Sequence, residues 1–131
     1  MMLFNFDIFS DDDVIIVNAR IEGKYKLRLA LDTAATHTTI DSNVLYFSGY
    51  ELKDSKGEAE IETSNGIILV EIYQIKSLEC LGITKQNFEV QVYDFSAHGI
   101  TSDYDGVIGL NFLRENKFCI DMIKREITID I

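Results

Sequence analysis

The sequence contains no proline and no tryptophan, and only two of its 131 residues are cysteine. Cys80 and Cys119 stand alone, whereas zinc sites and disulfide frameworks use clustered or regularly spaced cysteines. We therefore expect two reduced thiols, no metal site and no other cofactor. A chain of this length is expected to form a single domain over residues 1–131. It buries about two-thirds of its unfolded surface, so it needs no cross-link in order to fold.

Basic residues are also scarce, with 12 Lys and Arg against 22 Asp and Glu and a formal net charge of −10. Nucleic acids and anionic membranes attract basic proteins, so neither is expected as a partner. Near the N-terminus, Asp7 and the aspartates at 11–13 interrupt the apolar residues, and no basic segment precedes them. This pattern disfavours a signal peptide and a membrane span. A solvated acidic segment is the simplest interpretation of residues 11–13, and we expect a soluble, cytoplasmic protein.

Alternating apolar and polar residues predict an all-β fold. Residues 24–31 alternate cleanly and are expected to pair with residues 14–17 through a turn at Glu22-Gly23. The strongest turn signal is Asn65-Gly66, a pair that favours the positive φ angles of a type I′ turn. It predicts a hairpin between residues 58–64 and 67–73. Further strands are expected at 88–92, 118–120 and 127–131. Short helical turns are expected at 42–45, capped by Asp41 or Ser42, and at 111–116.

One polar feature interrupts this pattern where the strand over residues 24–31 ends. Leu31 leads directly into Asp32, which is followed by the small or hydroxylated residues Thr33-Ala34-Ala35-Thr36. A carboxylate at a buried strand end needs hydrogen-bond donors, and small neighbours let backbone amides and hydroxyls approach it. Taken alone, the segment indicates an ordinary turn in which Asp32 caps the loop through Thr33 or Thr36.

A second segment, Asp105-Gly106-Val107-Ile108-Gly109, predicts a buried strand that ends in glycine, and Leu110-Asn111-Phe112-Leu113 continues into a short helix. Together, Leu31-Asp32-Thr33-Ala34-Ala35 and Val107-Ile108-Gly109 resemble the two motifs of the retropepsin-like aspartic proteases. The resemblance covers residues 14–131, approximately. It implies the all-β, retropepsin-like acid-protease barrel with one short C-terminal helix.

The resemblance implies an aspartic endopeptidase in which two carboxylates share one proton and activate a water molecule. The chain has one loop of this kind, because Asp41, Asp54 and Asp105 lack the small residues that follow Asp32. The family's mechanism would therefore require a homodimer, with Asp32 beside the partner's Asp32. By the same resemblance, the catalytic loop is Asp32, Thr33 and Ala34.

The resemblance also implies how a peptide or protein substrate is held. An extended peptide would lie between a flap hairpin and the floor of the cleft and add main-chain hydrogen bonds like a strand. The residues implied for substrate binding are Ala35, Thr36, Thr63, Ser64, Asn65, Gly66, Val107 and Ile108.

Three positions differ from the family pattern. Ala34 stands where the family usually has glycine, and an added methyl group resists a positive φ. Thr36 and Leu110 stand where viral members have an acidic and a basic residue that pair with each other. Their joint absence favours a cellular branch of the family.

Two other hypotheses remain open. Ala34 motivates an inactive homodimer of the same fold that binds an extended peptide of a partner protein. The remaining hypothesis is a β-rich structural domain in which Asp32 only caps a turn. His37 is expected to be a loop side chain near the groove and His98 a solvated one, because no Ser/His/Asp set accompanies them.

Overall fold

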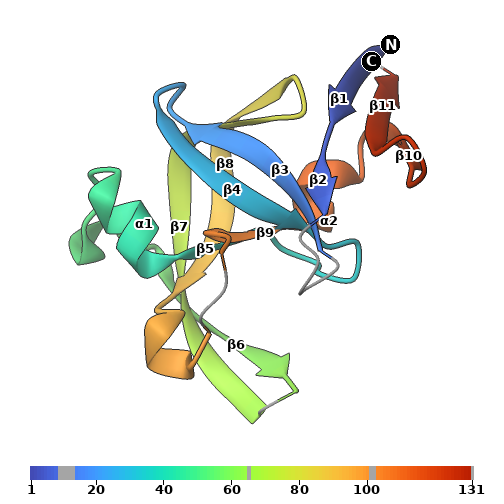
Figure 1. The fold of residues 1–131 in the computed structure, drawn as a ribbon. Helices are drawn as coiled ribbons and strands as arrows, with labels where there is room; N and C mark the ends of the chain where they lie inside the picture. Colours follow the sequence, from blue (N-terminus) through green and yellow to red (C-terminus); the bar gives the residue numbers. More distant parts are fainter. Residues whose placement is uncertain (9–13, 65, 101–102, 131) are drawn as a thin grey trace.

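The computed structural model describes residues 1–8, 14–64, 66–100 and 103–130. The aspartates at 11–13 and Asn65 lie outside these ranges. Figure 1 shows strands as the main elements, with short helices between them. In chain order the elements are β1 (Met2–Asn5), β2 (Asp7–Ile8), β3 (Ile15–Ile21), β4 (Tyr25–Leu31), β5 (Thr39–Asp41), α1 (Ser42–Phe47), η1 (Leu52–Asp54), β6 (Gly57–Thr63), β7 (Gly66–Cys80), β8 (Ile83–Tyr93), η2 (Ser96–His98), β9 (Gly106–Ile108), α2 (Leu110–Leu113), β10 (Lys117–Asp121) and β11 (Glu126–Asp130).

The larger sheet closes into a barrel. Its strand order is β2-β3-β4-β9-β5-β8-β7-β6, and an additional pairing of β3 with β7 closes a ring of six strands. Inward-facing side chains such as Leu29, Ile75 and Val90 are completely buried and form the core. The all-β prediction is confirmed. No helix in the described ranges is long and apolar enough to span a membrane.

The β3–β4 hairpin forms where the sequence predicts it, although its first strand extends to Ile21. Glu22 and Gly23 have φ angles of 54° and 71°. The Lys24 N–H donates to the Ile21 carbonyl at 3.1 Å, which closes the turn. This hairpin matters for the site because β4 ends immediately before Asp32.

The β6–β7 hairpin is also present, but its turn lies one residue earlier than predicted. Thr63 pairs with Gly66, whereas a turn at Asn65-Gly66 requires Ser64 opposite Ile67. Gly66 has a φ of 114°, so the chain uses the freedom of this glycine just after the turn. The Thr63 hydroxyl donates to the Gly66 carbonyl at 2.8 Å and stabilises this register.

The two chain ends form a second, three-stranded sheet in the order β1-β11-β10. The expected closing strand pair is confirmed, with Ile120 opposite Ile127. The sequence did not predict β1, which pairs along β11 from Met2 opposite Ile129. Figure 1 shows β1 and β11 side by side at the two ends of the chain.

Two short helices frame the barrel. The Asp41 carboxylate accepts hydrogen bonds from the backbone N–H of Asn43 at 3.3 Å, and so caps α1 as the sequence suggests. Helix α2 begins at Leu110, directly after Gly109, and ends at Leu113, before the end of the predicted range. Phe112 on α2 is completely buried, which anchors the helix to the barrel.

Candidate active site

Asp32 is held by backbone groups at the end of β4. Its N–H donates to the Ile108 carbonyl at 3.1 Å, which continues the parallel pairing of β4 with β9. Its Oδ1 accepts the Ala34 N–H at 2.9 Å, and its carbonyl accepts the Ala35 N–H at 3.2 Å. The expected cap is therefore present, but Ala34 is the donor to the carboxylate.

The loop after Asp32 is fixed to the start of α2. The Leu110 N–H donates to the Ala35 carbonyl at 2.8 Å, and the Asn111 N–H donates to the Thr36 carbonyl at 3.1 Å. The two motifs that are about 75 residues apart in the sequence thus lie side by side. Gly109 permits this contact, because a Cβ atom there would lie 2.7 Å from the His37 carbonyl carbon and oxygen.

A hydrogen-bond network around the buried Thr38 supports the loop. This network was not predicted from the sequence. Thr38 is completely buried, and its Oγ1 accepts the Gly109 N–H at 3.1 Å. The Asn111 Oδ1 accepts both the Thr38 N–H and the Thr38 hydroxyl at 2.8 Å. The Asn111 Nδ2 donates to the Glu89 carbonyl at 3.0 Å, which ties the network to β8. The signal in the sequence that could have predicted this network is Thr38, a hydroxyl residue between the Asp32 loop and the buried β5.

Ala34 occupies its position without backbone strain. It is not among the non-glycine residues that have a positive φ. Its amide donates to the Asp32 carboxylate, as a glycine amide would. The side chain is exposed, so the added methyl group displaces no core atom in this chain.

The residues implied for substrate binding lie in three parts of the chain. Ala35 and Thr36 follow Asp32 in the loop, and the Thr36 Oγ1 lies 3.0 Å from the His37 Nδ1. Val107 is half-buried on β9, whereas Ile108 is completely buried and presents only its backbone to the loop. Thr63, Ser64 and Gly66 are exposed at the tip of the β6–β7 hairpin.

The other aspartates considered from the sequence have local structural roles. Asp41 caps α1, and Asp54 accepts the Glu51 N–H at 2.9 Å at the start of η1. The Asp105 carboxylate accepts the Arg28 N–H at 2.8 Å. Of these four aspartates, Asp32 alone lies in the loop that is hydrogen-bonded to Leu110 and Asn111.

The histidines and the possible metal ligands add little to this site. His37 Nε2 lies 4.0 Å from a Glu89 carboxylate oxygen, with both side chains substantially exposed, and His98 Nδ1 lies 2.9 Å from the Asp94 carbonyl. Within the described ranges, no group of three or more His, Cys, Asp or Glu side chains is arranged to hold a metal ion.

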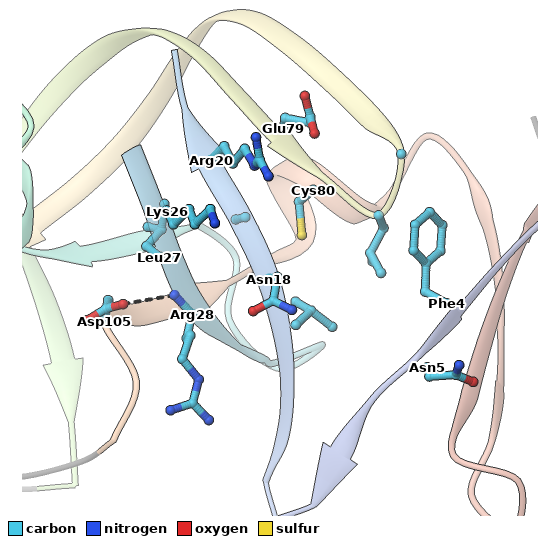
Figure 2. Close-up of a pocket in the computed structure, with 14 residues that line it drawn as sticks. Phe4, Asn5, Asn18, Arg20, Lys26, Leu27, Arg28, Glu79, Cys80 and Asp105 are labelled. Atoms are coloured by element: carbon cyan, nitrogen blue, oxygen red, sulfur yellow. Dashed lines mark hydrogen bonds between the residues drawn. The ribbon is translucent and has the colours of Figure 1, made fainter. Parts of the chain in front are cut away.

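One cavity lies away from the Asp32 loop. It has a volume of about 600 Å³ and is lined by Phe4 and Asn5 of β1 and by residues of β3 and β4. Figure 2 shows these two β1 residues across the cavity from Arg20 and Cys80. A smaller cavity of about 240 Å³ borders the loop itself, because Thr33 lines it together with apolar side chains of β4, α2 and β10.

The comparisons with known proteins agree with this geometry. The aspartyl protease family model matches residues 17–112, a range that contains Asp32, the β6–β7 hairpin and Gly109. A solved retropepsin-like aspartic protease from Rickettsia conorii has the same fold, with a TM-score of 0.71 and 19% identity over 98% of this chain and 88% of that chain. None of the curated proteins compared with the sequence matches it. Because the family match covers more than half of the sequence, the chain belongs to the aspartyl protease family, and its fold is retropepsin-like.

Proposed function

We propose that this protein is an aspartic endopeptidase that acts as a homodimer. The observation that carries the proposal is Asp32, which is half-buried at a strand end with one carboxylate oxygen held by the Ala34 amide. The loop is hydrogen-bonded to Leu110 and Asn111, and the Ala34 amide holds one carboxylate oxygen, which supports a defined position for the carboxylate. Such preorganisation serves acid–base chemistry, because the reacting groups need no rearrangement during the reaction.

The reaction requires a second carboxylate, which the partner's Asp32 supplies. Two carboxylates in close contact cannot both ionise, so they share one proton. The ionised carboxylate takes a proton from a bound water, whose oxygen attacks the peptide carbonyl carbon, while the neutral carboxyl donates its proton to the carbonyl oxygen. Transfer of a proton to the peptide nitrogen then allows the C–N bond to break. Thr33 and Ala34 hold the two loops in this arrangement.

The substrate is an extended segment of a peptide or protein. It lies between the tip of the β6–β7 hairpin (Thr63, Ser64, Asn65 and Gly66) and a floor formed by Ala35, Thr36 and Val107. The exposure of Thr63, Ser64 and Gly66 supports this assignment, as do the half-buried Ala35 and Val107 beside the exposed Thr36. Ile108 contributes through its carbonyl, which accepts the Asp32 N–H, and its side chain stays in the core.

Replacing Asp32 with asparagine tests the proposal. We expect the wild type to cleave a peptide library at mildly acidic pH, as followed by mass spectrometry. Asp32→Asn should lose at least about a hundredfold in rate, the scale of one general acid–base catalyst. Glu79→Gln is the matched control, because it removes the same charge from an exposed residue at the end of β7.

Sedimentation and circular dichroism would show that both variants keep the fold and the dimer. A wild type that is dimeric but inert between pH 3 and pH 7 would contradict the proposal. If that inert dimer binds an extended peptide by calorimetry, the non-catalytic binding function replaces it.

A further inference from the structure

We propose that the cavity of about 600 Å³ between β1 and the β3–β4 hairpin binds a small organic anion. Arg20 and Lys26 hold its anionic group, and its apolar body lies against Phe4 and Leu81. This site is separate from the Asp32 loop, so its function is additional to the proposed cleavage of peptides.

The first observation is the size and shape of the cavity. Its volume lies within the range of about 300–1,000 Å³ that is usual for small-molecule sites. Phe4 is half-buried and Leu81 is buried, and together they form an apolar wall at the β1 end. Figure 2 shows Phe4 on one side of β3 and Lys26 on the other, with Arg20 extending from β3 itself.

The second observation is that cationic side chains gather on the outer face of the β3–β4 hairpin. Ala19 and Leu27 are buried in the core, so their chain neighbours Arg20 and Lys26 point outward. Arg28 lies two residues after Lys26, on the same face of β4. Three of the 12 Lys and Arg residues of this acidic chain therefore line one cavity.

The third observation is an uncompensated pair of like charges. Arg20 and Lys26 lie directly opposite each other in the β3–β4 pairing, an arrangement that destabilises a sheet by repulsion. In the part of the chain that the structure describes, neither side chain forms an ion pair with a carboxylate. Glu79 lies opposite Arg20 on β7, so this row holds one carboxylate and two cations. A bound anion would relieve the repulsion and accept N–H groups from both cations.

The remaining polar residues of the lining also favour an anion. The cavity is lined by two carboxylates, Glu79 and Asp105, and Asp105 already accepts the Arg28 N–H at 2.8 Å (Figure 2). The lining keeps an excess of one positive charge within a chain of formal charge −10. The side-chain amides of Asn5 and Asn18 add neutral N–H donors.

Fluorescence titration with anilinonaphthalenesulfonate, which joins a sulfonate to an apolar body, tests the site. We expect the wild type to bind this probe at low salt. The double variant Arg20→Gln with Lys26→Gln should raise the dissociation constant at least about tenfold, because the sulfonate loses two charged donors. Phenylnaphthylamine, which has the same apolar body without the sulfonate, should bind both proteins with equal affinity.

Three controls accompany the titration. The double variant Lys53→Gln with Lys56→Gln removes the same two charges from exposed residues at η1, and should change the dissociation constant less than about twofold. Asp32→Asn should bind the sulfonate like the wild type, because Asp32 does not line the cavity. Arg20→Gln with Lys26→Gln should unfold at a urea concentration no lower than the wild type, because it removes a repulsion.

Three results would overturn the site. The first is equal weakening in the two double variants, which would mean that the probe responds only to net charge. The second is an equal loss of the neutral probe, and the third is a lower urea midpoint for Arg20→Gln with Lys26→Gln, which would assign these cations a structural role. Peptide cleavage by a protein that binds no probe leaves the endopeptidase proposal standing. Selective binding of the sulfonate by a protein that cleaves nothing supports the anion site and contradicts the endopeptidase proposal.

Discussion

Ala34 illustrates at the scale of one residue how the backbone sets the effect of a side chain. The sequence motivated an inactive protein because a methyl group stands where the family usually has glycine. A glycine is required where φ is positive or where the backbone must approach another group closely. Ala34 has no positive φ, and its amide still binds the Asp32 carboxylate. Neither condition applies within one chain.

Ala34→Gly is therefore expected to leave the rate of peptide cleavage within about threefold of the wild type. Its unfolding free energy should fall by less than about 1 kcal/mol, since glycine adds freedom to the unfolded chain. Cleavage kinetics and urea denaturation measure the two effects. A gain of tenfold or more in rate would show that the methyl group obstructs the dimer or the substrate.

Thr38 makes a second prediction at this scale. Its hydroxyl accepts the buried Gly109 N–H and donates to Asn111. Thr38→Val keeps the shape but leaves these groups without that partner, so we expect a loss of about 1–3 kcal/mol in urea denaturation. Thr38→Ser keeps the hydroxyl and is the matched control. Equal losses in both variants would mean that packing of the methyl group, and not the hydrogen bonds, is what matters.

At the scale of elements, the β6–β7 hairpin differs from the barrel strands. Among the described residues, β6 pairs only with β7, and its residues are exposed or half-buried. The part of β7 from Glu71 to Cys80 pairs with β8, and its end pairs also with β3. Tyr73, Ile75 and Leu78 in this part are completely buried. Segments with few buried contacts open locally at low free energy.

Hydrogen exchange should show this difference. We expect amide protons of residues 58–63 to exchange at least about a hundredfold faster than those of residues 73–80, because local opening exposes the hairpin without unfolding the barrel. Mass spectrometry of the free protein measures both segments in one experiment. Equal protection would mean that the hairpin is as stable as the barrel and does not open independently.

At the scale of the whole molecule, charge opposes association. Each chain carries a formal charge of −10, so a dimer carries twice that, −20. Salt shortens the range of charge interactions, from about 30 Å at 0.01 M to about 10 Å at 0.1 M.

The dimer dissociation constant should therefore fall several-fold between 0.01 M and 0.1 M salt in sedimentation equilibrium. The reason is that self-repulsion is screened while burial of apolar surface is retained. A constant that rises with salt would mean that charge pairs dominate the interface.

Local sequence patterns determined much of the fold. Alternation over residues 24–31 predicts β4 because one face of that strand is buried. A cap at Asp41 or Ser42 predicts the start of α1, and in the structure the Asp41 side chain binds a nearby amide. The β6–β7 turn was placed one residue late, since Asn-Gly permits a turn without fixing where the pairing begins. β1 was missed because its pairing with β11 joins opposite ends of the chain.

The sequence by itself determined that an aspartate ends a buried strand and that a second motif stands about 75 residues later. Only the tertiary structure decided that the two motifs touch, through Leu110, Asn111 and the close approach of Gly109 to His37. Only the tertiary structure decided the Thr38–Asn111 network as well. Local propensity depends on neighbours along the chain, whereas these features depend on which strands lie side by side once the barrel has closed.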